Sequence, residues 1–298
     1  MLEKIKTSIR KYINEKYYVL GFVEKEYANS NTSADLFSHI KWLDTGGYGT
    51  GWFADPFFLS ADEEEIVILA EEKVYAQNKG RIVKLSIDAK TYKLLSVRPV
   101  LELDTHLSFP YVFRENGKIY VCPENRKSGE LPLYEYDLET DKLVNRQVLV
   151  REPLVDSQLL KIDGDYFILA VCQDGDKQFD AKLRVYKSQS LYGPYKQIQE
   201  IVSTTKTKRG AGAIVEIDGR MIRPSQNCSD SYGGSVIINH LIYEGGQFAE
   251  SVISEISPDC SMPNGLGLHT LNVMGGLCVV DGKDYKHKRL VKFIHKFK

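Results

Sequence analysis

Short apolar segments separated by polar turns repeat along most of the chain. Five units each contain an apolar strand, a turn rich in glycine or acidic residues, and a second apolar strand. The turns fall near residues 63, 117, 164, 219 and 276. Their spacing of roughly 47 to 57 residues is close to the length of one four-stranded propeller blade. The pattern therefore predicts five blades.

A third alternating segment follows each hairpin, at residues 82–85, 133–136, 183–186, 238–242 and 290–294. Alternating Tyr, Val and Ile are typical of half-buried strands. The N-terminus differs, because apolar residues recur there at three- and four-residue steps, at Leu2, Ile5, Ile9 and Ile13. This spacing indicates an amphipathic helix. The apolar run 18–23 is expected to add a strand to the last blade and close the ring.

We therefore expect an all-β fold, a five-bladed β-propeller with a short N-terminal helix. The expected organisation is a helical segment over residues 1–17 and the propeller over residues 18–298. A chain of 298 residues is compatible with one large all-β domain.

Composition narrows the classes of partner. The 39 basic and 40 acidic residues nearly cancel, so the overall charge does not favour nucleic acid. Five dispersed cysteines without a CxxC pair indicate neither a zinc site nor a disulfide framework, and no metal or cofactor is predicted. The chain begins without a signal-peptide pattern and contains no apolar run of about 20 residues, so we expect a cytoplasmic protein. The lysine-rich residues 283–298 leave two alternatives open, peripheral contact with an anionic membrane or a solvated face of the last blade.

The candidate chemistry lies at the starts of the units. The first strand of each propeller blade lines the axis, so polar residues that open the units are expected to converge in one funnel. These residues are Asp55, His106, Ser108, Asp156, Arg209 and His269. Second strands can add Glu124, Arg223 and Gln226, and the Trp52 ring is suited to stacking on a sugar.

Structural alternatives remain open for these positions. Asp55 precedes a proline and could form a turn, as could Asp156. The two histidines could bond to backbone groups, and Glu124 could be solvated. Arg209 could belong to a solvated basic loop, whereas Arg223 within an apolar strand needs a partner if it is buried.

Carboxylates around one cavity are what glycosidic-bond chemistry requires. One protonates the leaving oxygen and another activates the incoming nucleophile. Asp55, Glu124 and Asp156 are the candidates for these roles. The candidates for binding hydroxyls or a donor phosphate are His106, His269, Arg209 and Arg223.

Five motifs resemble known families: Trp52–Phe57, His106–Pro110, Pro123–Asn125, Arg223–Gln226 and His269–Asn272. The blade layout with axial acids is similar to the furanosidase-like propellers of glycoside hydrolase family 43. The motifs are more similar to the propeller beside the transferase domain of plant glucosamine inositolphosphorylceramide transferases, and to small proteins of bacterial surface-polysaccharide clusters. The resemblance covers roughly residues 18 to 285.

The hydrolase resemblance implies an axial base, a pKa modulator and a general acid in blades one, two and three, usually Asp, Asp and Glu. Asp55 matches the first. Blade two offers His106 and Ser108, and blade three offers Asp156, with Glu124 displaced to a second strand.

The expected function is glycosyl transfer during surface-polysaccharide assembly. Asp55 would be the base or nucleophile-side carboxylate, and Glu124 or Asp156 the partner acid. The implied partners are a carbohydrate or sugar-phosphate donor and a glycan acceptor, with peripheral contact to a membrane or a polysaccharide-assembly complex. Hydrolysis of a furanoside or related short glycan, and glycan binding without catalysis, are the alternatives.

Overall fold

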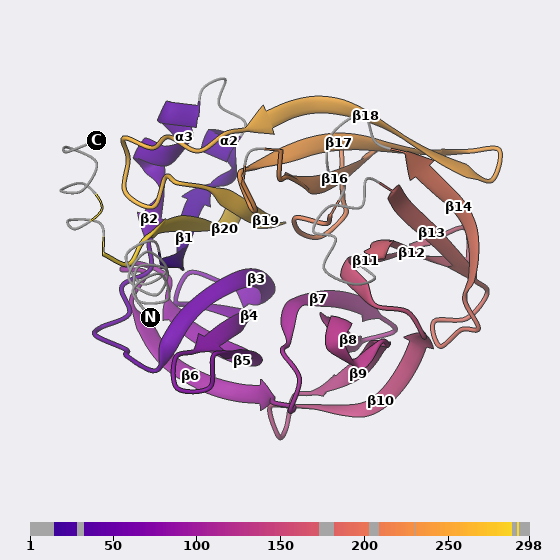
Figure 1. The fold of residues 1–298 in the computed structure, drawn as a ribbon, viewed down its shortest axis with the longest axis horizontal. Coiled ribbons are helices and arrows are strands. Elements are labelled where there is room, and N and C mark those ends of the chain that lie inside the picture. Colours follow the sequence, from indigo (N-terminus) through magenta and orange to yellow (C-terminus); the bar gives the residue numbers. More distant parts are fainter. Residues whose placement is uncertain are drawn as a thin grey trace, which may run out of the picture.

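The described strands form a ring of five sheets. The computed structural model describes residues 15–28, 33–172, 182–202, 209–229, 231–287 and 291. Each sheet has four strands, and the sheets surround one axis (Figure 1). The expected five-bladed β-propeller is confirmed.

The first four blades follow the chain in order. Blade 1 consists of β3 (Gly51–Ala61), β4 (Glu65–Val74), β5 (Lys79–Asp88) and β6 (Leu94–Leu101). Blade 2 consists of β7 (Ser108–Glu115), β8 (Lys118–Glu124), β9 (Leu131–Asp137) and β10 (Lys142–Val150), with the 3₁₀ turn η1 (Arg126–Ser128) after β8. Blade 3 consists of β11 (Leu154–Ile162), β12 (Asp165–Cys172), β13 (Lys182–Ser188) and β14 (Lys196–Val202). Blade 4 consists of β15 (Val215–Ile217), β16 (Arg220–Asn227), β17 (Ser235–Glu244) and β18 (Gln247–Ile256).

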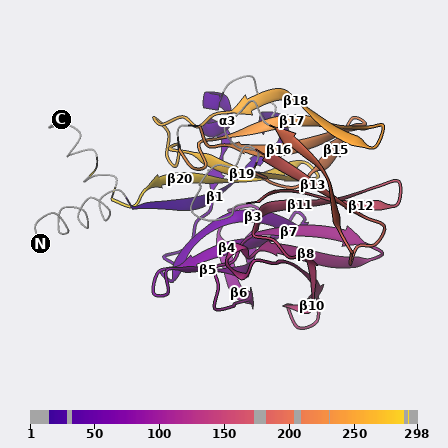
Figure 2. The same cartoon turned by 45° about the vertical axis from the view of Figure 1, so that its right-hand side comes forward.

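Blade 5 joins the two ends of the propeller. Its strands are β19 (Leu268–Met274), β20 (Leu277–Tyr285), β1 (Lys16–Glu24) and β2 (Lys41–Trp42). Figure 2 shows β1 beside β20, with which it pairs from Lys16↔Tyr285 to Glu24↔Leu277. The predicted closure by residues 18–23 is therefore confirmed.

The prediction of a third strand over residues 290–294 is wrong, because β1 occupies that place beside β20. Val291 is the only described residue of that segment, and its amide donates to the His287 carbonyl. The other four third-strand segments lie within β5, β9, β13 and β17. All five predicted turns also lie between the first and second strands of a blade.

Two short helices, α2 (Lys25–Ala28) and α3 (Ser33–His39), connect β1 to β2. None of the helices among the described residues is long and apolar enough to cross a membrane. The predicted helix over residues 1–16 falls almost wholly on residues 1–14, outside the described part of the chain. The division at residue 17 therefore stays a prediction, although β1 already begins at Lys16.

Apolar side chains fill the spaces between neighbouring blades. In β4 both faces carry buried residues, because each sheet is covered on two sides by other blades. Between blades 1 and 2, for example, the rings of Phe57 and Phe109 pack edge to face with centroids 4.9 Å apart. This packing holds the inner strands at fixed positions around the axis.

Candidate functional site

A β-bulge interrupts the pairing of the inner strand in blades 1, 2, 3 and 5. In each case the register shifts directly after an equivalent position, Ala54, Ser108, Val155 or Leu268, and the pairing resumes three residues later. The first bulge residues are therefore equivalent, and they are Asp55, Phe109, Asp156 and His269. The first three have left-handed backbone angles, with φ of 51°, 41° and 45°. Non-glycine residues adopt this conformation only when the surrounding structure holds it, and such strain is frequent at functional sites.

Second strands contribute acids at the same level of the ring. Glu71 pairs with Ala54 and Glu124 pairs with Ser108, so the two glutamates occupy equivalent positions in blades 1 and 2. Asp281 of β20 accepts a 2.9 Å hydrogen bond from the Asp55 amide in the next blade. Glu124 likewise accepts a 3.2 Å bond from the Asp156 amide. An acid from one blade thus fixes the bulge of its neighbour.

Asp55, His269 and Asp281 form the Asp55 cluster. The His269 ring lies between the two carboxylates, with Nδ1 2.8 Å from Asp281 and Nε2 3.3 Å from Asp55. The Thr270 hydroxyl lies 3.0 Å from an oxygen of each acid, and the Phe109 amide donates to Asp55 at 3.0 Å. All three cluster residues are buried.

Charge coupling determines protonation in the Asp55 cluster. Burial raises the pKa of Asp55 to about 6, although the neighbouring His269 opposes this rise. Burial alone would lower the pKa of His269, but Asp281 and Asp55 outweigh it and raise that pKa to about 9. Burial also acts to raise the pKa of Asp281, yet His269 holds it below its ordinary value. Near neutral pH the cluster therefore contains an imidazolium between two carboxylates.

The Asp55 cluster also has the spacing of a metal site. One ligand atom from each of its three residues lies within 4.8 Å of the others. However, the imidazole occupies the space between the carboxylates, and Asp281 already accepts bonds from the Asp55 and Thr270 amides. We therefore assign no metal to these residues.

Glu124, Asp156 and Arg209 form the Glu124 cluster. Arg209 Nε donates to Asp156 at 2.5 Å, and its Nη2 lies 3.6 Å from Glu124. Gln226 also donates to Asp156, at 2.9 Å. The guanidinium lies over the Tyr232 ring at 5.1 Å from its centroid. Arg209 thus neutralises Asp156 and holds it away from solvent.

Glu124 differs from its neighbour in protonation. Burial is the main cause that raises its pKa to about 8, and the nearby Asp156 carboxylate adds to the rise against the opposing Arg209. Glu124 is therefore protonated at neutral pH and can donate a proton.

His106 stands beside Glu71 at the edge of the site. The Gly80 amide donates to its Nδ1 at 2.8 Å, so the proton of the neutral ring is on Nε2, which faces Glu71 at 3.4 Å. A Cβ at Gly80 would lie 2.7 Å from this ring, so the close approach requires glycine. Burial and the cations Lys73 and Lys127 lower the pKa of His106 to about 4. Burial raises the pKa of Glu71 well above its usual range.

A cavity of about 640 Å³ opens over these groups. Of the predicted site residues, it is lined by His106, Glu124 and Arg209. Asp55 and Asp156 are only 4% and 3% exposed and do not line it. Glu124 is thus the one predicted catalytic acid at the cavity wall.

The other predicted contacts lie behind this wall or away from it. Trp52 packs on Tyr18, which in turn packs on His269 with ring centroids 4.5 Å apart. Ser108 is buried opposite Glu124, and Gln226 is buried against Asp156.

Arg223 differs most from its predicted role of binding substrate. It is fully buried, and it donates to Gln158 at 2.6 Å and to Glu250 of β18 at 2.7 Å. These bonds satisfy a buried guanidinium and link β16 of blade 4 to β11 of blade 3, so Arg223 stabilises blade 4 and its contact with blade 3 instead of lining the cavity.

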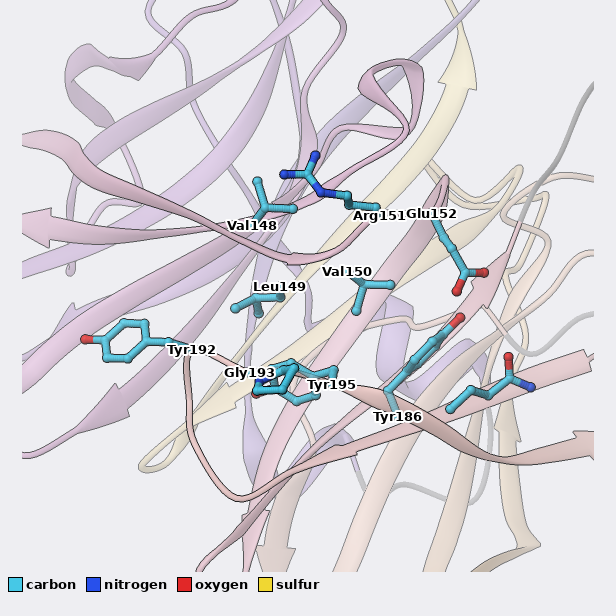
Figure 3. A pocket seen from close by; sticks show the side chains of 11 residues that line it. Val148, Leu149, Val150, Arg151, Glu152, Tyr186, Tyr192, Gly193 and Tyr195 are labelled. Carbon is cyan, nitrogen blue, oxygen red and sulfur yellow. The ribbon is translucent and has the colours of Figure 1, made fainter.

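A second cavity of about 550 Å³ lies at the outer edge, between β10 of blade 2 and β13 of blade 3 (Figure 3). Tyr186, Tyr192 and Tyr195 line it together with Arg151 and Glu152. None of the predicted site residues lies there, and Glu152 is paired with Arg184 at 2.5 Å. The cavity at the axis is therefore the better candidate.

The sequence interpretation missed Glu71, Asp281 and Tyr232. The two acids carried a usable signal, because Glu71, Glu124 and Asp281 each follow an apolar stretch in the second strand of a unit. Aligning these second strands with one another would have identified them. Tyr232 lies in a connecting segment between β16 and β17, where the sequence contains no repeat signal.

Comparison with known proteins adds a family match. The family model described as "Glucosamine inositolphosphorylceramide transferase 1, N-terminal" matches residues 23–259. Glucosamine inositolphosphorylceramide transferase 1 of Oryza sativa subsp. japonica is 32% identical over 199 residues, 64% of this chain and 26% of the relative. The protein of the same name from Arabidopsis thaliana is 28% identical over 202 residues, 65% of this chain and 26% of the relative. The chain thus spans about a quarter of the length of these curated relatives.

Solved structures share the fold at low sequence identity. An exo-β-1,3-galactanase from Clostridium thermocellum superposes with a TM-score of 0.57 at 14% identity, covering 79% of this chain and 59% of the galactanase. An exo-β-1,3-galactanase from Phanerochaete chrysosporium, solved with β-1,3-galactotriose, has a TM-score of 0.55 at 15% identity and covers 72% and 58% of the two chains. At this identity the likeness concerns the fold alone.

Proposed function

Because this chain belongs to the family of glucosamine inositolphosphorylceramide transferase N-terminal domains, we propose that its funnel binds the sugar of a glycosyl-transfer substrate. The chain corresponds to only 26% of the rice relative, so transfer itself is part of the proposal. The site would hold a carbohydrate or sugar-phosphate donor, a glycan acceptor, or both.

The observation that carries this proposal is the protonated Glu124 at the cavity wall. Its pKa of about 8 makes it an acid at neutral pH, and it lies in the wall beside Arg209 and Tyr232. Breaking a glycosidic bond requires such an acid, because the leaving oxygen must gain a proton. Glu124 can also donate a hydrogen bond to a sugar hydroxyl.

The complementary base would be Asp55. Its pKa of about 6 leaves it ionised at neutral pH, whereas Glu124 with its pKa of about 8 is protonated. Two carboxyl groups whose pKa values differ in this way are typical of an acid–base pair. Asp156 is a weaker candidate for either role because its carboxylate already accepts hydrogen bonds from Arg209 and Gln226.

Hydrolysis of the kind carried out by family 43 enzymes is less well supported. The resemblance implies an axial acid in blade two as the pKa modulator. The equivalent bulge position here is Phe109, which cannot ionise. The neutral His106 and the buried Ser108 do not restore that charge.

Binding of a glycan without catalysis is the second candidate function. It is favoured by the burial of Asp55, which is 4% exposed and already accepts bonds from Thr270 and Phe109. A base in this position must be reached by an acceptor hydroxyl before it can act. If it is not reached, the cavity recognises a sugar and another domain performs the transfer.

Measurements of turnover and of sugar binding by the full chain distinguish glycosyl transfer from glycan binding without catalysis. Nucleotide release is measured with a panel of sugar nucleotides and glycan acceptors, and sugar binding is measured by calorimetry. Glu124→Gln is expected to lower turnover by about 10²-fold or more, whereas Glu135→Gln on β9, the third strand of the same blade, serves as the matched control. Full turnover by Glu124→Gln or Asp55→Asn would contradict the acid–base assignment. Sugar binding without turnover in the wild-type protein would favour the binding function.

We further propose that the process served is surface-polysaccharide assembly, at the cytoplasmic face of the membrane or within an assembly complex. The support is the resemblance of the site motifs, from Trp52–Phe57 to His269–Asn272, to proteins of bacterial polysaccharide clusters. The lysine-rich residues 283–298, which would contact the membrane, lie mostly outside the described part of the chain.

A further inference from the structure

The cavity at the outer edge between β10 and β13 is one of a pair. A further cavity of about 400 Å³ is lined by residues of β9 and β10, and Tyr192 lines both cavities, so they meet at its ring. Figure 3 shows Tyr192 at one end of the first cavity and Glu152 with Tyr186 at the other. At about 550 and 400 Å³, each has the volume of a small-molecule site, which is typically about 300–1,000 Å³. We call the residues that line these two cavities the outer groove.

Tyr192 is exposed and yet fixed in position. It is 53% exposed, but its hydroxyl shares a 3.1 Å hydrogen bond with the hydroxyl of Tyr120 in the neighbouring blade, and the two rings pack edge to face. The backbone around it is also held, because the Tyr192 amide donates to the Ser190 hydroxyl at 3.2 Å and the Gly193 amide donates to the Ser190 carbonyl at 3.0 Å. A ligand that stacks on a ring held in this way costs little conformational entropy.

The outer strand of blade 2, β10, forms another wall of the outer groove, and it is irregular. Its pairing with β9 shifts register twice, between Val144 and Gln147 and between Val148 and Val150. Asn145, inside the first shift, has a left-handed φ of 51°. Such irregularities prevent another strand from pairing with the edge of a sheet. A peptide that extends a sheet needs a regular edge, so the outer groove does not suit this kind of partner.

The charges of the outer groove are already compensated. Each of its charged side chains has a partner of opposite charge, in the pairs Glu135–Lys118, Arg151–Glu130 and Glu152–Arg184. Its other polar side chains are its tyrosines and the amides of Asn145, Gln147 and Gln197. We assign no ligand contact to the paired charges. A groove without excess charge favours an uncharged ligand that forms many hydrogen bonds.

The free tyrosine ring and the amides are complementary to a sugar. The face of the Tyr192 ring is apolar, and the C–H groups of a sugar ring can pack against it. Gln147 lines one cavity and Gln197 lines the other. An amide both donates and accepts hydrogen bonds, as a sugar hydroxyl does. The side-chain amide of Gln147 has no hydrogen-bond partner among the described residues, so it is available to a ligand.

We propose that the outer groove is a second carbohydrate site, which binds an uncharged stretch of a glycan chain with one sugar stacked on Tyr192. Gln147 bonds the hydroxyls of the unit in one cavity, and Gln197 bonds those of the neighbouring unit in the other. The inference goes beyond the proposed function, because the outer groove shares no lining residue with the cavity at the axis and needs no catalysis. A long glycan held here would keep its end at a raised concentration near the funnel.

Binding and its location are measured together on the full chain. The uncharged probes are cellotetraose, maltotetraose and β-1,3-galactotriose. A hyaluronan tetrasaccharide serves as the anionic probe, and a proline-rich peptide represents the other class of ligand that binds aromatic grooves. NMR titration of the ligand signals gives Kd, and hydrogen exchange of the protein locates the site. Slower exchange over residues 190–197 marks the outer groove, whereas slower exchange over residues 106–127 marks the cavity at the axis.

The decisive variant is Tyr192→Ala, which is expected to weaken binding of the uncharged probes at the outer groove about tenfold or more, because the stacking ring is lost. Tyr192→Phe retains the ring and should weaken binding by less than about threefold. Gln147→Ala removes an amide that supports no other contact and should weaken binding by about threefold or more. The matched control is Leu138→Ala, which shortens a side chain that is 70% exposed between β9 and β10, and it should leave binding unchanged. Melting temperatures establish that all four variants are folded.

The outcomes test the outer groove separately from the cavity at the axis. Slower exchange over residues 190–197 with an uncharged probe, lost in Tyr192→Ala and retained in Leu138→Ala, would support the proposal. Equal binding by the wild-type protein and Tyr192→Ala, or no binding of any uncharged probe at millimolar concentration, would overturn it. Tighter binding of hyaluronan or of the proline-rich peptide at the outer groove would also overturn it, because the ligand would then not be an uncharged glycan. Slower exchange confined to residues 106–127 would overturn the outer groove and support the sugar site at the axis.

Discussion

The Asp55 cluster and the Glu124 cluster use the same backbone device for different chemistry. In both, a bulge aspartate has left-handed backbone angles, and an acid from the preceding blade accepts its amide hydrogen. The Asp55 cluster is neutralised by His269, which can lose its proton, and is sealed beneath Tyr18. The Glu124 cluster is neutralised by Arg209, which cannot lose its proton, and this cluster is open to the cavity. The same backbone conformation in two blades therefore does not give the two clusters the same function.

The largest expected effect on the free energy of unfolding comes from removing Arg209, the cation that cannot lose its proton. Arg209→Met would leave Asp156 buried beside Glu124 without a countercharge, and we expect a loss of about 3 to 5 kcal/mol in the free energy of unfolding. Urea denaturation measures this loss. Arg98→Met, which removes the exposed partner of Asp141, should cost less than about 1 kcal/mol. Equal losses in the two variants would show that Arg209 does not hold the cluster together.

A pH-dependent effect is expected from the Asp55 cluster. His269 has a pKa of about 9 in the folded protein and about 6.5 when unfolded, so the folded state binds the proton more tightly. Its stabilisation is complete below pH 6.5 and is lost as the pH rises through 9, which amounts to about 3 kcal/mol. Urea unfolding across this range measures the loss.

This measurement is made in the Glu124→Gln background, because Glu124 also titrates between its ordinary pKa and about 8. Adding His269→Gln should then make the decline between pH 6.5 and 9 smaller, and Glu71, whose pKa burial also raises, contributes to what remains. An unchanged decline in the double variant would assign the proton to another group.

The smallest effect on stability is expected from Glu124→Gln itself. Glutamine resembles the protonated acid, so at pH 5 the free energy of unfolding should change by less than about 1 kcal/mol. As the pH rises through about 8, the wild-type protein should lose more stability than the variant, because the variant lacks the part of the loss that Glu124 causes. A large destabilisation at pH 5 would mean that Glu124 is ionised in the folded protein, and the cluster would then resemble the Asp55 cluster more closely than we infer.

The sequence by itself determined most of the fold. Turn residues such as Asn116–Gly117 and Asp163–Gly164, flanked by alternating apolar residues, act through local backbone preference, and every predicted turn was correct. The N-terminal strand was also predictable, because a ring of half-buried strands needs an apolar segment to close it. The third strand of blade 5 was misassigned because residues 290–294 have the same local pattern as β1.

Only the tertiary structure decided which polar residues meet at the cavity. A bulge shifts the direction of every following side chain by one position, so Phe109 instead of His106 or Ser108 is equivalent to Asp55. Whether a buried charge such as Arg223 lines the cavity or pairs within the packed blades depends on partners far away in the chain, here Gln158 of blade 3 and Glu250 of blade 4. Local sequence determines strands and turns. Whether a polar side chain reaches the cavity, and whether it is protonated there, depends on long-range packing and charge, which no local pattern contains.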